Sequence, residues 1–465
     1  MSEALSILQD SLQSADGFVE LRYHAKRSSS VAVEKGKVER TQARHRSGVA
    51  VRVLADGAWG FASTGSLDKG SVERAIDNAR IAAKSAGGAR RDSLDALPAV
   101  DLARGNFDQP GIDELLARPL EEKVGMATEL EQRTREGSTH VRSATCGYSE
   151  VFEEKAIVTT DGAAASFRLV RPELRLQAVA ERDGQLSTGF ESIGVTGGWE
   201  CLFRNGSGEH FADKAASTAV DLLSAGQPEG GRATVIMAPS IVGLLVHEAI
   251  GHTVEADFVQ AGSVAQGKIG EMVASPLVTL CDSGASEFYA GAGGTIPIDD
   301  EGVLTGRTTI IDQGRLASYL HNRESAARFG VSPTGNARAW EYSDQPLIRM
   351  RNTYMAPGSQ SLEEIIASTE DGYLLEGPRN GQADSTGEFM FGVQVARRIR
   401  GGKLGEMVKG VTISGIAFDV LASVDAVSSE FRWDLGSGYC GKGQPAKVDA
   451  GGPYVRARVL LGGDQ

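Results

Sequence analysis

Apolar residues recur along this chain at two spacings, and each spacing predicts a different kind of element. Alternating apolar and polar residues are typical of strands with one buried face. They fill residues 18–23, 31–34 and 48–53 and return between residues 141 and 188. Apolar residues three and four positions apart predict amphipathic helices, which fall at residues 5–12, 72–86, 120–135 and 209–224. The first half of the chain therefore combines strands with helices.

Turn and linker sequences divide the chain. Lys35-Gly36 and Asp56-Gly57 lie between strand-like runs and suit hairpin turns. Residues 88–113 are rich in Gly, Asp, Arg and Pro and predict a break between two subdomains. The segment Gly226-Gln-Pro-Glu-Gly-Gly231 predicts the main domain boundary. We therefore expect an N-terminal α+β region over residues 1–227 and a C-terminal domain over residues 228–465.

The C-terminal domain has a different pattern from the first half. Helical spacing is confined to residues 241–258, 324–329 and 361–368, whereas short strand-like runs are frequent. This combination predicts a mainly antiparallel β domain. The fold class expected for the whole chain is α+β, with an N-terminal α/β region of strands and helices ahead of the β domain.

Composition excludes several classes of protein. Among 465 residues, 48 Lys and Arg against 61 Asp and Glu give a net charge of −13, which argues against a nucleic-acid surface. The four cysteines form no CxxC pair, so a disulfide scaffold or zinc ribbon is not expected. The N-terminus lacks the basic start of a signal peptide, and the most apolar run, residues 233–246, is too short to span a membrane. We expect a soluble, cytoplasmic protein without a membrane partner.

The segment His247-Glu-Ala-Ile-Gly-His252 carries the clearest candidate chemistry. Zinc proteases of the HExxH type place two histidines four residues apart on one helix face. Here the spacing is five, which sets the side chains roughly 140° apart on a straight helix. They converge on one ion only if a π-bulge or unwinding distorts the helix, and Gly251 is a candidate place for it. A buried helix with hydrogen-bonded histidines explains the same pattern.

A cysteine near the C-terminus offers a third ligand. Cys440 lies in Gly436-Ser-Gly-Tyr-Cys-Gly-Lys-Gly-Gln444, and its glycine neighbours predict an exposed turn rather than a core position. A thiolate binds Zn²⁺ well beside imidazole. The alternative is an ordinary buried thiol.

Several motifs in this order resemble the TldD/PmbA family of metallopeptidases, and specifically its active, TldD-like subunit. The resemblance covers nearly the whole chain, from the glycine-rich hairpin region at residues 48–63 to the terminal segment 440–444. Between them lie the HExxxH segment with Glu255-Ala-Asp-Phe258 after it, and three further stretches: Asp299-Asp-Glu-Gly302, Pro333-Thr-Gly-Asn336 and residues 349–358.

The resemblance implies a function and a ligand set. It implies one Zn²⁺ per chain, held by His247, His252 and Cys440, with Glu248 as the general base. It implies a peptidase that hydrolyses small or unfolded peptides, and a homodimer or a heterodimer with an inactive PmbA/TldE-type subunit. Some relatives act in antibiotic or other natural-product maturation.

Further residues have candidate roles around that site. Glu255 and Asp257 follow the second histidine closely enough to orient an imidazole ligand. The candidate oxyanion donors are Tyr354, Arg349, Arg351 and His321. Residues 352–358 and 373–376 could offer a strand edge to an extended peptide.

Three other functions remain compatible with the sequence. The first is an amide or dipeptide hydrolase with the same metal chemistry. The second is a non-catalytic partner subunit, which the presence of Glu248 and all three ligand candidates disfavours. The third is a cysteine hydrolase with Cys440 as nucleophile, which leaves the HExxxH pairing unexplained.

Overall fold

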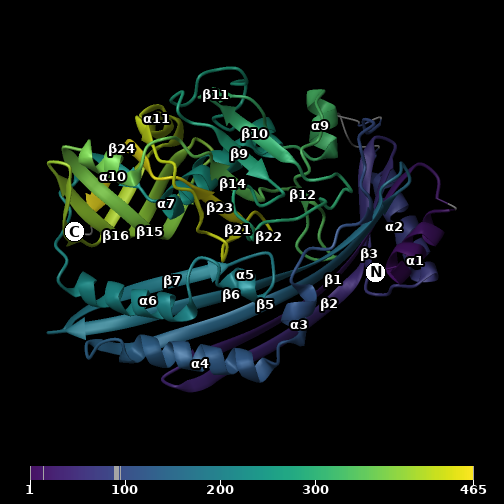
Figure 1. Ribbon diagram of the computed structural model, residues 1–465. Helices are drawn as coiled ribbons and strands as arrows, with labels where there is room; N and C mark the ends of the chain where they lie inside the picture. Colours follow the sequence, from purple (N-terminus) through teal and green to yellow (C-terminus); the bar gives the residue numbers. More distant parts are fainter. Residues whose placement is uncertain (1, 14, 88–93, 95, 464–465) are drawn as a thin grey trace.

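The computed structural model describes residues 2–13, 15–87, 94 and 96–463. Groups of strands and helices are mixed before residue 225, and strands predominate after residue 231, so the predicted α+β class is confirmed. The termini belong to different parts of the molecule, since the first helix lies at one end of a long curved sheet and the last strand lies in a compact C-terminal part (Figure 1). Part of the predicted break at residues 88–113, namely residues 88–93 and 95, lies outside the described residues.

Long antiparallel strands form the N-terminal sheet. Its order is β3-β2-β1-β5-β6-β4, with β7 paired to β6. The strands are β1 (Phe18–Glu34), β2 (Lys37–Ala55), β3 (Ala58–Thr64), β4 (Arg104–Asn106), β5 (Val141–Thr159), β6 (Ala164–Arg182) and β7 (Gln185–Gly194). The runs expected at residues 18–23 and 31–34 belong to one strand, because the polar stretch between them is paired with β2 on one side and β5 on the other.

The predicted turns and helices of this part form as expected. Lys35-Gly36 and Asp56-Gly57 both have positive φ at each residue, which is the geometry of a tight hairpin turn. All four predicted helices are present. The helices are α1 (Ser2–Leu12), α2 (Lys69–Gly87), α3 (Ile112–Ala117), α4 (Leu120–Glu136), α5 (Trp199–Leu202) and α6 (Gly208–Leu223).

The two faces of the long sheet have different partners. Alternate residues of a strand point to opposite faces, and in β6 Leu174 and Leu176 pack with the core under α4 and α6. Arg171 and Glu173 point the other way and bond to the C-terminal part. Figure 1 shows α4 and the C-terminal part on opposite sides of the sheet. The C-terminal part therefore rests on a charged but buried face.

The C-terminal part contains a closed barrel. Strands pair in the order β15-β8-β24-β18-β16, and β16 pairs back to β15; β17 and β19 add to β16 and β24. The strands are β8 (Gly231–Met237), β15 (Asp371–Ala383), β16 (Glu388–Arg400), β17 (Lys403–Val408), β18 (Val411–Ile416), β19 (Ala426–Val427) and β24 (Val455–Gly463). Pairing is antiparallel except between β15 and β8.

A second sheet stands beside the barrel, in the order β11-β10-β9-β14-β23-β20. It consists of β9 (Leu280–Ser283), β10 (Arg307–Asp312), β11 (Arg315–Leu316), β14 (Asn352–Met355), β20 (Arg432–Trp433) and β23 (Asp449–Gly452). Two small hairpins pair β12 (Ala337–Arg338) with β13 (Leu347–Ile348) and β21 (Tyr439–Gly441) with β22 (Pro445–Lys447). The remaining helices are α7 (Pro239–Leu245), α8 (Ala256–Gln260), α9 (Arg323–Phe329), α10 (Leu362–Ala367) and α11 (Ala417–Ala422).

The expected free strand edges do not exist. β14 lies between β9 and β23, and residues 373–375 of β15 are paired with both β8 and β16. Their backbone groups are already bonded, so neither segment offers the edge that was predicted for a peptide.

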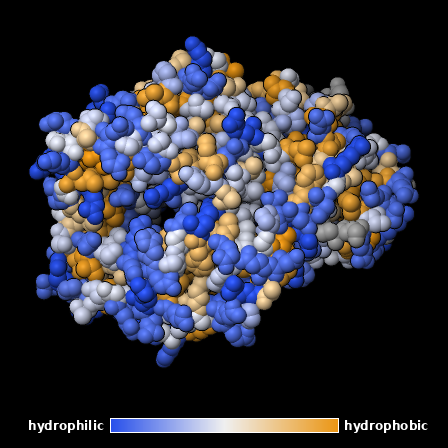
Figure 2. All heavy atoms as spheres, in the orientation of Figure 1, coloured by the Kyte–Doolittle hydropathy of each residue, from blue (hydrophilic) through white to orange (hydrophobic). Residues whose placement is uncertain are grey.

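The visible face of the molecule is mainly hydrophilic, with separate hydrophobic patches (Figure 2). No helix within the described residues is long and apolar enough to cross a membrane.

Candidate metal centre

The HExxxH segment is distorted in the way that its spacing requires. α7 ends at Leu245, a π-helix follows over Val246–Gly251, and a 3₁₀ turn covers His252–Val254. A π-helix has more residues per turn than an α-helix, so a five-residue spacing returns to the same face. Gly251 ends the π-helix, where a Cβ would lie 1.9 Å from Sδ of Met350. Glycine at this position allows the distorted segment to pack against Met350.

This geometry brings His247, His252 and Cys440 together. One ligand atom from each lies within 4.8 Å of the others, and Sγ of Cys440 is 3.0 Å from Nε2 of His252. His247 is 3% exposed, and among the described residues neither of its ring nitrogens has a hydrogen-bond partner. A buried imidazole without a partner is costly. Two imidazoles and a thiolate form a typical zinc donor set, so these residues fit a metal ion.

Cys440 differs from its sequence-based expectation in one respect. It was predicted in an exposed turn, but it is buried in β21, and the turn lies at the following residues, where Gly443 has positive φ. The glycines therefore allow the tight turn of the hairpin, and they do not expose the thiol of Cys440.

The ligand candidates influence one another's protonation. Burial alone would raise the pKa of Cys440, but the charge of His247 and the hydrogen bond with His252 lower it to about 4. Burial would lower the pKa of His252, but its hydrogen bonds with Cys440 and Glu255 raise it to about 10. The cysteine is thereby held as a thiolate, the form that binds metal.

Glu248 lies beside the cluster and reaches solvent. Its Oε2 is 3.7 Å from Nε2 of His252, and its side chain is 29% exposed. The carboxylate is therefore accessible to a water molecule next to the ligand candidates. This position suits a residue that accepts and returns a proton.

Glu255 and Asp257 lie behind His252, and the structure joins them through Lys442. Oε2 of the fully buried Glu255 is 3.0 Å from Nδ1 of His252. Nζ of Lys442 lies 3.1 Å from the same Oε2 and 2.7 Å from Oδ2 of Asp257. Burial would raise the pKa of Glu255, but His252 and Lys442 lower it. A carboxylate that fixes an imidazole ligand is a common outer partner of metal sites.

The hairpin that carries Cys440 is held from two other directions. The buried guanidinium of Arg349 donates to the carbonyl oxygens of Cys440 and Gln444, at 2.6 and 2.7 Å. From the N-terminal sheet, Glu173 accepts from the hydroxyl of Tyr439 at 2.6 Å and pairs with Lys447. Arg349 was predicted as an oxyanion donor, but these two NH groups serve the hairpin.

The other three predicted oxyanion donors have their contacts elsewhere. Tyr354 lies in β14 within an aromatic cluster with Phe431 and Trp433. Arg351 is buried and paired with Asp282 at 2.8 Å. His321 bonds to Ser325, and burial lowers its pKa to about 4. These contacts give no support to an oxyanion role.

Sequence reasoning missed two residues that support the centre. Lys442 had a visible signal, since it lies two positions after Cys440 in the terminal segment 440–444. Glu173 had none, because it lies 267 positions before Cys440 in the sequence and only the tertiary fold brings the two together.

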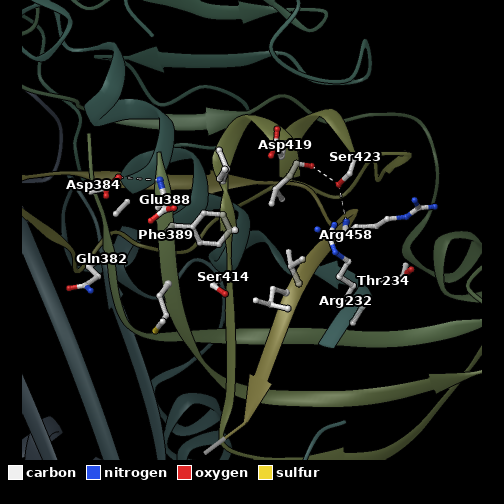
Figure 3. A pocket seen from close by; sticks show the side chains of 18 residues that line it. Arg232, Thr234, Gln382, Asp384, Glu388, Phe389, Ser414, Asp419, Ser423 and Arg458 are labelled. Carbon is white, nitrogen blue, oxygen red and sulfur yellow. Dashed lines mark hydrogen bonds between the residues drawn. The ribbon is translucent and has the colours of Figure 1, made fainter. Parts of the chain in front are cut away.

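A large groove on the barrel is separate from this cluster. It has a volume of about 1120 Å³ and opens beside α11, where the pairing of β18 with β24 ends. Asp384 and Glu388 lie toward one end, Arg232 and Arg458 toward the other, and Phe389 and Ser414 between them (Figure 3). None of the ligand candidates lines it.

Comparison with known families gives three matches that together span most of the chain. Residues 19–83 match the PmbA/TldA metallopeptidase domain 1, residues 113–223 the central domain, and residues 230–461 the C-terminal domain. The three ligand candidates and Glu248 fall in the third match.

Individual proteins are similar over almost their full length. A metalloprotease of Methanothermobacter thermautotrophicus is 35% identical over 98% of this chain and 98% of its own. A zinc metalloprotease TldD homologue of Saccharolobus solfataricus is 27% identical, over 95% of this chain and 96% of its own. The crystal structure of TldE from Thermococcus kodakarensis has the same fold, with a TM-score of 0.80 at 19% identity, covering 99% of this chain and 100% of that one.

Proposed function

Because this chain belongs to the PmbA/TldD family of metallopeptidases, we propose that it is a zinc-dependent peptidase acting on small or unfolded peptides. The observation that carries the proposal is the convergence of His247, His252 and Cys440, with Glu248 beside them. One zinc ion per chain is the proposed cofactor. The name of the Saccharolobus solfataricus relative supports zinc over another divalent metal.

The proposed chemistry divides the work among a few residues. A zinc ion held by this donor set would lower the pKa of a coordinated water toward about 7 and polarise a carbonyl group. Glu248 would accept the proton of the attacking water at its carboxylate and return it to the leaving amine. Glu255, which is bonded to Nδ1 of His252, would hold that imidazole with Nε2 toward the metal.

Hydrolysis of defined substrates tests this function. Zinc-loaded protein is incubated with unstructured peptides, with a folded protein and with small acylated amines, and products are identified by mass spectrometry. The proposal predicts cleavage of the peptides alone, and loss of that cleavage in Glu248→Gln. Cleavage confined to the acylated amines would favour an amide hydrolase. Full activity in Glu248→Gln that requires Cys440 would favour a cysteine hydrolase.

We also propose that the chain works as a dimer, either with a second copy or with a PmbA/TldE-type subunit. Its membership of the PmbA/TldD family and its likeness in fold to a TldE structure support this partnership. Light scattering on the purified chain tests the homodimer: the expected mass is twice 49.0 kDa. A monomer that cleaves peptides without any added subunit would contradict both forms of the proposal.

A further inference from the structure

One lysine connects the two separate segments that supply the ligand candidates. Lys442 lies in the turn of the β21–β22 hairpin, two residues after Cys440. Its Nζ reaches across to the segment after His252, at 3.1 Å from Glu255 and 2.7 Å from Asp257. It also donates to the carbonyl oxygen of Ile348 at 3.1 Å.

The environment of Lys442 fixes its side chain. Its side chain is 12% exposed, and its Nζ lies 4.4 Å from the centre of the Phe258 ring. The stem of a lysine has several rotatable bonds, so ordering it is entropically costly unless the bonds at its end offset that cost. Here the carboxylates of Glu255 and Asp257, the carbonyl oxygen of Ile348 and the ring of Phe258 offset the entropic cost. Removing the ammonium group that pairs with the fully buried Glu255 is more costly than breaking a surface ion pair, because it leaves a buried charge without that partner.

These contacts form an unbroken chain between two ligands. His252 is bonded to Glu255, Glu255 to Lys442, and Lys442 is joined to Cys440 by two peptide units. Resting on the metallopeptidase function proposed above, we propose that Lys442 is a positioning residue. Its ammonium group locks the Cys440 hairpin onto the histidine segment and thereby sets the spacing of the ligand atoms.

The charge of Lys442 makes the direction of the effect informative. Removal of a positive charge next to a cation site would by itself strengthen metal binding, by Coulomb's law. Loss of positioning would weaken it. A fall in metal affinity on removal of the ammonium therefore measures the positioning role and cannot arise from the charge alone.

The test compares four variants with the wild type. Lys442→Met keeps the stem and removes the ammonium, and Lys442→Arg keeps a charged donor. Glu255→Gln removes the charge of the carboxylate partner, alone and combined with Lys442→Met. The control is Lys403→Met, an exposed lysine at the start of β17, directly after the turn that joins it to β16. Zinc affinity is measured by competition with a chromophoric chelator, and ligand geometry by the absorption spectrum of the cobalt(II) form.

The proposal predicts about a 10- to 100-fold loss of zinc affinity in Lys442→Met, the range found for outer partners of metal ligands. The thiolate-to-cobalt absorption should change, Lys442→Arg should recover part of the affinity, and Lys403→Met should match the wild type. Because Lys442 and Glu255 act through one chain of contacts, the double variant should lose less than the sum of the single losses. Wild-type affinity in Lys442→Met, or additive losses, would overturn the proposal.

A measurement without metal separates this inference from the proposed function. Hydrogen exchange of residues 438–448 in metal-free protein should be faster in Lys442→Met than in the wild type, while exchange in the distant α2 stays the same. If the wild type bound no zinc, the proposed metallopeptidase function would be wrong. Equal hydrogen exchange in Lys442→Met and the wild type would still overturn the positioning role of Lys442. Zinc binding without peptide cleavage would overturn the proposed peptidase function, whereas the positioning role of Lys442 would still be supported by weaker zinc binding and faster exchange in Lys442→Met.

Discussion

The pair between Glu173 and Lys447 predicts a large and pH-dependent loss of stability on a small substitution. Glu173 belongs to the N-terminal sheet and Lys447 to the Cys440 hairpin; they are 3% and 2% exposed. Glu173→Gln keeps the shape and an acceptor for Tyr439 but leaves the ammonium buried and unpaired. Breaking a buried pair in this way costs about 3–5 kcal/mol.

The pH dependence follows from the lysine. Burial lowers the pKa of Lys447, and the charge of Glu173 opposes that fall. Without Glu173 the folded-state pKa falls further, so the variant loses most stability at low pH, where the unfolded chain keeps the proton. Stability returns as pH rises through the folded-state pKa toward the unfolded value of about 10.4. The deficit of Glu173→Gln should therefore be smaller at pH 9 than at pH 6.

Urea unfolding of the metal-free wild type and Glu173→Gln at pH 6 and pH 9 measures the difference in unfolding free energy. A double variant, Glu173→Gln with Lys447→Met, is the control, because it removes the unpaired charge and keeps the acceptor for Tyr439. It should recover most of the stability lost in Glu173→Gln. A loss below about 1 kcal/mol in Glu173→Gln, the size of a surface ion pair, or a loss equal at both pH values, would refute the reasoning.

Three further predictions concern the centre itself. Glu248→Gln should lower kcat for peptide cleavage by roughly 10²–10⁴ while zinc content stays that of the wild type; equal kcat would exclude Glu248 as the base. Gly251→Ala should lower the unfolding free energy by about 1–3 kcal/mol, measured by urea titration, since the new Cβ meets Met350 at 1.9 Å; an unchanged midpoint would show that the packing relaxes freely. Chelation should lower the thermal midpoint, because zinc at 1,000 times its Kd contributes about 4 kcal/mol; calorimetry that shows no shift would contradict a bound metal.

Local sequence signals predicted the elements well. The helices of the N-terminal half carry regular apolar spacing, and the turns at Lys35-Gly36 and Asp56-Gly57 carry residues that tolerate positive φ. The π-distortion of the HExxxH segment also follows from spacing, since five residues match no α-helical face. Each of these features depends on residues close together in the sequence.

Features that depend on distant pairing were predicted poorly. The polar middle of β1 suggested two short strands, but hydrogen bonds to β2 and β5 keep these residues in one continuous strand. The predicted edges at β14 and β15 are covered by strands from elsewhere in the chain. Arg349 was predicted as an oxyanion donor because a lone arginine gives no local indication of its partner, and in the structure its guanidinium donates to the carbonyl oxygen of Cys440.

The central claim is that His247, His252 and Cys440 hold one metal ion. Elemental mass spectrometry on the wild type and on Cys440→Ala, both made without a His tag or added metal, tests it most directly. We predict about one zinc per chain in the wild type and little or none in the variant. Absence of stoichiometric metal in the wild type, even after zinc is offered at neutral pH, would contradict the account.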